Sequence, residues 1–276
     1  MGRLNKYGIA VIAFLVSINA ASWALSFQST LESIKVEGRP GQLVNRKFQL
    51  ILSKDGQRTH FKARTEDWWR SEDGKQSYYR EAGILTRSCA KWVKLNPTEI
   101  DVDPEGTLSI RVSIAIPPDV KPGGYWCVLT VDETPDPLKN ISGVGIRFLA
   151  SVSVGIFVNI TPLERSAQIT DVKVMPDQAS VKLCNKGNCP LGVEGRFEFL
   201  RKGESEPVTT IKIPRGTLLP EPITTGMFSA NLPDIKVLPS GRYIVRVILD
   251  IGLDHFIGAQ KEMDVNRDVP NPTPNK

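Results

Sequence analysis

Apolar and polar residues alternate along one long segment of the chain. From Ile146 to Ile160 every even-numbered position is apolar, and only Leu149 and Phe157 break the polar pattern of the odd positions. A period of two places successive side chains on opposite faces of a β-strand. At roughly 3.3 Å per residue such a strand would extend about 50 Å, well beyond the length of about 20 Å that is usual.

Shorter runs of the same kind recur between turns rich in glycine, proline, asparagine and aspartate, and helical patterns are nearly absent. Before the long segment we expect strands at 31–36, 48–53, 60–66, 78–81, 92–95, 107–116 and 125–131. After it we expect strands at 168–174, 179–183, 192–200, 208–213, 224–230, 243–249 and 256–265. This pattern predicts an all-β protein with two immunoglobulin-like β-sandwich domains in tandem.

The first 24 residues have the features of a signal peptide. Arg3 and Lys6 precede an apolar run, and Ser22 and Ala24 are the small residues that a signal peptidase requires. We expect cleavage after Ala24 and export to the periplasm or cell envelope. The alternative is a retained anchor, but the run is shorter than the roughly 18 apolar residues of a membrane span.

The remaining chain divides near Pro162, because proline interrupts the ladder of hydrogen bonds in a sheet. We expect a first domain at 25–162, a second at 163–265 and a flexible tail at 266–276.

Charge and histidine content exclude several classes of function. Without the signal peptide the chain carries 33 Lys+Arg against 30 Asp+Glu, with no basic run, so we expect no nucleic-acid partner. His60 and His255 fall in different predicted domains, and no Gly-x-Ser-x-Gly turn or glycine-rich phosphate loop is present. We therefore expect no enzyme, no cofactor, no metal site and no stable membrane insertion after cleavage.

Four cysteines in an exported chain suggest two disulfides. Cys184 and Cys189 bracket a turn sequence, so we expect them to face each other across a hairpin and to form one bridge. Cys89 and Cys127 would then form the other bridge, provided that their strands are neighbours.

A longer stretch resembles a known family. Residues 96–135 read NPTEIDVDPEGTLSIRVSIAIPPDVKPGGYWCVLTVDETP, and the long alternating strand follows and ends at Pro162. This order of strands and loops resembles the first domain of the periplasmic chaperones of pilus assembly. In that family the last strand of the first domain is added to a pilus subunit that lacks a strand of its own.

The resemblance implies that this chain binds a protein subunit of the envelope or of a pilus. We expect the partner-binding strand to display Val152, Val154, Ile156 and Val158, whereas the alternative is that these side chains fill the domain's own core. The family also holds the subunit's C-terminal carboxylate with a lysine in this strand and an arginine near the start of the chain. Phe157 stands where the lysine would be, and Lys35 is only a weak match for the arginine.

A second candidate site is an aromatic hairpin around the turn Asp73-Gly74. Trp68 and Trp69 precede the turn and Tyr78 and Tyr79 follow it, and adjacent residues of a strand point to opposite faces. At least one tryptophan should therefore lie near the surface, where it could stack on a sugar or anchor a protein. The alternatives are that the outward ring covers a neighbouring loop or the domain junction, and that the protein is a structural or glycan-binding module of the envelope.

Overall fold

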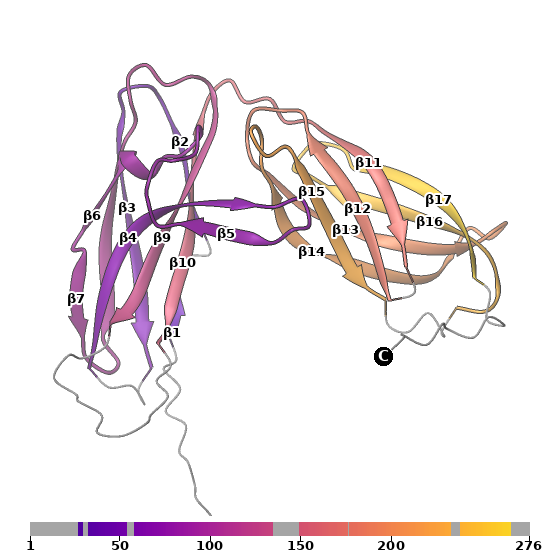
Figure 1. Ribbon diagram of the computed structural model, residues 1–276, viewed down its shortest axis with the longest axis horizontal. Coiled ribbons are helices and arrows are strands. Elements are labelled where there is room, and N and C mark those ends of the chain that lie inside the picture. The colour runs from indigo at the N-terminus through magenta and orange to yellow at the C-terminus, as the bar shows by residue number, and fades with distance from the viewer. Residues whose placement is uncertain are drawn as a thin grey trace, which may run out of the picture.

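The computed structural model describes residues 27–29, 33–53, 58–134, 149–175, 177–232 and 238–265. These residues form two β-sandwiches that meet at one end with an angle between their long axes (Figure 1). In this part of the chain no helix has the length and apolarity to cross a membrane. The expected signal peptide and tail lie outside the described residues.

The first sandwich contains two facing sheets. The first sheet has the order β1 (Phe27–Ser29), β3 (Leu43–Leu52), β8 (Thr107–Ala115) and β6 (Val93–Asn96). The second has the order β2 (Ser33–Gly38), β10 (Ser151–Ile160), β9 (Gly123–Thr134), β4 (Thr59–Arg70) and β5 (Gln76–Tyr79), and β7 (Glu99–Val102) also pairs with β4. A short 3₁₀ turn, Ala90–Trp92, precedes β6.

Strict alternation builds the core of this sandwich. In β8 the side chains of Leu108, Ile110, Val112 and Ile114 are buried, while the residues between them face outward. Because every second residue of β10 is also apolar, its inner face completes the same core from the opposite sheet.

The second sandwich contains all seven strands that we predicted for it. One sheet has the order β11 (Ala167–Val174), β12 (Gln178–Asn185) and β15 (Thr225–Asn231). The other has the order β14 (Pro207–Leu218), β13 (Leu191–Arg201), β16 (Gly241–Asp250) and β17 (Ile257–Val265). The predicted fold class, two immunoglobulin-like sandwiches in tandem, is confirmed.

The predicted bridge between Cys184 and Cys189 is wrong, because all four cysteines are free thiols. The segment between them is not a hairpin turn: β12 and β13 belong to different sheets, so the chain crosses the sandwich here. Cys189 is buried in the core, whereas Cys184 lies between the buried residues Leu183 and Asn185 and faces the other side of its strand.

The other cysteine pair lies together in the first core. The Sγ atoms of Cys89 and Cys127 are 3.1 Å apart, and both residues are fully buried. The structure thus places the pair as adjacent thiols rather than as the disulfide that we predicted. Burial raises the pKa of the Cys127 thiol well above its ordinary value, because the thiolate would lose its hydration.

Candidate functional site

The two halves of β10 have different neighbours. From Gly155 to Ile160 the strand lies between β9 on one side and the parallel strand β2 on the other. From Ser151 to Val154 it pairs with β9 alone among the described residues. Among the described residues these four therefore lie at an edge of the sheet, and Ser151–Val154 is called the open edge below.

The backbone register shows which groups lie along this open edge. The Glu133 N–H donates to the Ala150 carbonyl at 2.8 Å, so the backbone groups of Ala150 face β9. In an antiparallel ladder the direction alternates from one residue to the next. The N–H and C=O groups of Ser151 and Ser153 therefore face away from β9, where an added strand could pair with them.

The side chains of β10 correct one prediction. Val154, Ile156 and Val158 are 2%, 0% and 0% exposed, and they belong to the core of the first sandwich. The expectation that they are displayed is wrong, because the even-numbered face of β10 is the inner face of its sheet. Val152 is half-buried at the margin of the same core, so it is the apolar side chain of Ser151–Val154 that remains partly accessible, whereas Val154 is buried.

Polar groups occupy the opposite face next to the open edge. The Ser151 hydroxyl donates to Asp132 at 2.6 Å, and the hydroxyl oxygens of Ser153 and Thr130 are 3.2 Å apart. Thr130 in turn donates to the buried carboxylate of Glu66 at 2.7 Å. The edge therefore presents an apolar row on its inner face and a hydrogen-bonded polar row on its outer face.

The four aromatic residues of the hairpin do not form one patch. Trp68 is only 4% exposed, so the expectation that it belongs to a surface patch is wrong. Its indole N–H donates to the Cys127 carbonyl at 3.2 Å. Trp68 packs in a small cluster with Leu219 of the second sandwich, which agrees with the alternative that a hairpin ring covers the domain junction.

The other aromatic residues of the hairpin remain accessible. Trp69 stacks on Tyr79 with ring centroids 6.3 Å apart and an angle of 15° between the planes. Tyr78 is paired with Trp68 across the two strands, is 47% exposed and lines the cleft between the sandwiches. The hairpin therefore has one face toward the cleft and one away from it.

The tip of the same hairpin reaches the second sandwich (Figure 1). The Met227 N–H, on the edge strand β15, donates to the Glu72 carbonyl at 2.7 Å. The Glu72 carboxylate also forms an ion pair with Lys182 of β12. The tip thus covers part of the β15 edge and links the two sandwiches.

A glycine allows the sandwiches to approach closely. The Gly124 N–H, at the start of β9, donates to the Asn188 carbonyl at 2.9 Å. A Cβ atom at position 124 would clash with Pro190 and would lie 2.9 Å from the Cα atom of Cys189. Sequence analysis missed this contact, although the pair Gly123-Gly124 is the signal that could have indicated a close backbone approach.

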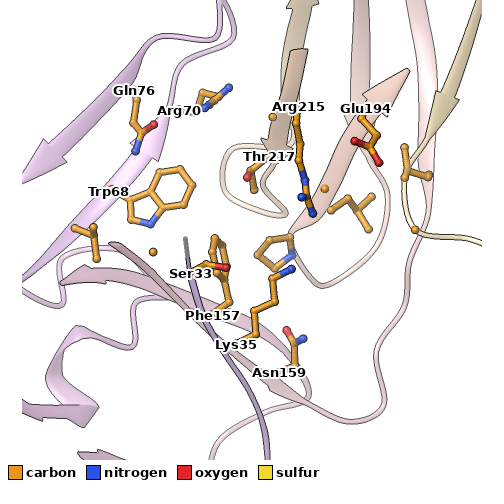
Figure 2. Close-up of a pocket in the computed structure, with 18 of the residues that line it drawn as sticks. Ser33, Lys35, Trp68, Arg70, Gln76, Phe157, Asn159, Glu194, Arg215 and Thr217 are labelled. Atoms are coloured by element: carbon orange, nitrogen blue, oxygen red, sulfur yellow. The ribbon is translucent and has the colours of Figure 1, made fainter. Parts of the chain in front are cut away.

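A cleft of about 950 Å³ lies between the sandwiches next to these contacts, and Figure 2 shows its walls. Lys35 and Phe157 are register partners on β2 and β10, and both line the cleft. Lys35, the weak match for the family's arginine, therefore lies next to Phe157, which stands where the family has its lysine.

The two histidines lie in different sandwiches and each is close to a carboxylate. His60 Nδ1 lies 2.8 Å from Asp101 on β7, and this hydrogen bond lowers the pKa of the Asp101 carboxyl. His255 Nδ1 lies 2.6 Å from Asp254 and likewise lowers that carboxyl's pKa. Within the described ranges, no group of three or more histidine, cysteine or acidic side chains is arranged to hold a metal ion.

No family model matches this chain, and no curated protein matches it. The chain is similar to several solved fimbrial chaperone structures. One chain from a structure of the chaperone and tip adhesin complex of CFA/I fimbriae biogenesis is 12% identical to this chain. The match covers 86% of this chain and 98% of that chain, with a TM-score of 0.48. The class 5 fimbriae chaperone CfaA is 13% identical; the match covers 86% of this chain and 99% of CfaA, with a TM-score of 0.47. The E. coli chaperone DraB is 14% identical; the match covers 88% of this chain and 96% of DraB, with a TM-score of 0.41. Because these identities and TM-scores are low, the fold and the function rest on this chain's own residues.

Proposed function

We propose that this protein is exported and binds a protein subunit of the cell envelope or of a pilus by β-strand addition. The observation that carries the proposal is the open edge Ser151–Val154, where the backbone groups of two serines have no neighbouring strand in the described part of the chain. An extended segment of a partner could pair with those groups and continue the sheet.

The geometry of the edge defines what such a segment would look like. Next to Val152 and Val154 the partner would place apolar side chains that extend the core, and next to Ser151 and Ser153 it would place polar ones. The pairing would stop near Gly155, because β2 already occupies the edge from that residue onward. The partner strand should therefore alternate between apolar and polar residues in the register that the edge sets.

A proline at position 153 tests the proposal. Proline has no N–H, so Ser153→Pro removes a donor from the open edge and leaves the bonds to β9 in place. Ser153→Ala is the matched control, because it removes the same hydroxyl and keeps the N–H. The mature protein would be used to capture partners from an envelope extract, and captured proteins would be identified by mass spectrometry.

We expect wild type and Ser153→Ala to retain a small subunit that lacks one strand of its own fold, and Ser153→Pro to lose it. Circular dichroism and urea unfolding would show whether each variant folds, and Ser151→Pro provides a second edge-blocking variant. Equal capture of the subunit by folded proline variants would contradict strand addition at this edge.

A further inference from the structure

The cleft between the sandwiches has a cationic wall that the proposed strand addition does not use. Arg70, at the end of β4, and Arg215, on β14, both line the cleft. Figure 2 shows Arg215 reaching from β14 into the cleft and Lys35 extending toward it from the opposite side. None of these three side chains forms an ion pair with a residue that the structure describes.

Arg70 adds a second guanidinium to this wall. Its Nε atom is buried and has no hydrogen-bond acceptor among the residues that the structure describes. Burial lowers the pKa of its guanidinium, and the Nη1 atom would lie 3.2 Å from a Cβ atom at Gly216 across the domain junction. Because this Nε atom has no accessible surface, a ligand in the cleft would meet the Arg70 guanidinium only at its other nitrogen atoms.

The balance of charge in the cleft limits the kind of anion. The lining includes four cations, namely Lys35, Arg70, Arg165 and Arg215. It also includes three carboxylates, namely Glu37, Glu194 and Asp250. A polyanion such as a nucleic acid would be repelled by these carboxylates, whereas a ligand with one negative charge matches the small cationic excess.

The remaining wall suits a ligand rich in hydroxyl groups. The half-exposed ring of Tyr78 offers a flat apolar surface, and the amides of Gln76 and Asn159 and the hydroxyl of Thr217 offer donors and acceptors. An extended peptide fits the β10 side of this cleft less well, because the backbone of Gly155–Ile160 is already paired on both sides.

We propose that the cleft binds a saccharide that carries one carboxylate. The carboxylate accepts hydrogen bonds from Arg215, since a guanidinium presents paired donors that match a carboxylate. A neighbouring sugar ring packs on Tyr78, and its hydroxyl groups bond to the polar side chains of the wall.

Titration calorimetry with a defined probe tests this site. The probe is an aldotriouronic acid, in which one methylglucuronate is joined to two xylose residues, and its neutral methyl ester is the first control. A hexapeptide with a free C-terminal carboxylate tests whether a peptide end is bound instead. The variant is Arg215→Gln, and the matched control is Lys212→Gln, an exposed cation of the same strand that lies outside the cleft.

We expect the acid to bind the wild type and Lys212→Gln equally, and Arg215→Gln and the ester each to weaken binding by about tenfold or more. Ser151→Pro, the edge-blocking variant at a residue that does not line the cleft, should leave saccharide binding unchanged, which separates this site from strand addition. The proposal is overturned if the ester binds as tightly as the acid, if Arg215→Gln has no effect, if only the peptide binds, or if no probe binds.

Discussion

The two halves of β10 share one sequence pattern but differ in the strand beside them. In Gly155–Ile160 the backbone is paired on both sides and the even-numbered side chains are fully enclosed. In Ser151–Val154 the same alternation continues, yet no described strand lies beside its outer edge. The difference shows that alternation decides which face a side chain takes, whereas the neighbouring strand decides whether the backbone is available to a partner.

The largest loss of stability is expected from a change in Gly155–Ile160, the half of β10 that β2 covers and that is called the covered half below. Ile156→Ala removes a fully buried side chain from the core of the first sandwich and leaves a cavity. We expect the free energy of unfolding to fall by about 2–5 kcal/mol, as measured by urea denaturation.

The matched change in the open half is Val152→Ala. Because Val152 is only half-buried, its loss should destabilise the protein clearly less than Ile156→Ala does. Equal losses at the two positions would mean that the halves do not differ as the structure shows.

A smaller effect than that of Ile156→Ala is expected when β2, the strand that covers Gly155–Ile160, loses a buried side chain. Val36, on β2, is buried and pairs with Val158 of β10. Val36→Ala removes two methyl groups and should cost about 1.6 kcal/mol at about 0.8 kcal/mol per group. Hydrogen exchange should quicken at residues 155–160 and stay unchanged at 151–154; uniform acceleration along β10 would argue against β2 as the specific cover.

The hairpin tip over β15 gives a still smaller effect. Glu72→Gln removes the exposed ion pair with Lys182, and such pairs contribute about 0.2–1 kcal/mol. We expect little change in global stability but faster hydrogen exchange at the Met227 N–H, which the tip covers. Lys75→Gln, at the same tip without an ion pair in the described residues, is the control and should leave that exchange rate unchanged.

The sequence alone predicted most strands and the alternation along β10, because period-two alternation is a local signal. It missed the three-residue strand β1, which is too short to show alternation. It also could not show that Ser33–Gly38 pairs with Gly155–Ile160, because this parallel pairing joins segments far apart in the chain.

The errors at the candidate sites have the same origin. Alternation shows that Trp68 and Trp69 face opposite sides, but only the packing of Leu219 against Trp68 decides which of the two is buried. Likewise, the turn residues between Cys184 and Cys189 are compatible both with a hairpin and with a crossing from one sheet to the other, and the structure has the crossing. In both cases the outcome depends on a distant part of the second sandwich.

At neutral pH the smallest effect concerns a buried thiol that lies beside Gly155–Ile160. Cys127 is the register partner of Ile156, and burial raises its pKa, with smaller contributions from Cys89 and Asp67. The unfolded thiol ionises near its ordinary pKa of about 8.5, whereas the folded one stays protonated to higher pH. The stabilising contribution is therefore complete below about pH 8.5 and decreases as the pH rises above it.

We accordingly expect urea denaturation to show a steeper alkaline loss of stability for the wild type than for Cys127→Ala. Cys184→Ala is the control, because it removes a partly exposed thiol in the second sandwich, away from β10. Parallel losses of stability in Cys127→Ala and the wild type above about pH 8.5 would mean that the Cys127 thiol is hydrated. In that case the covered half of β10 would not be fully enclosed at Ile156.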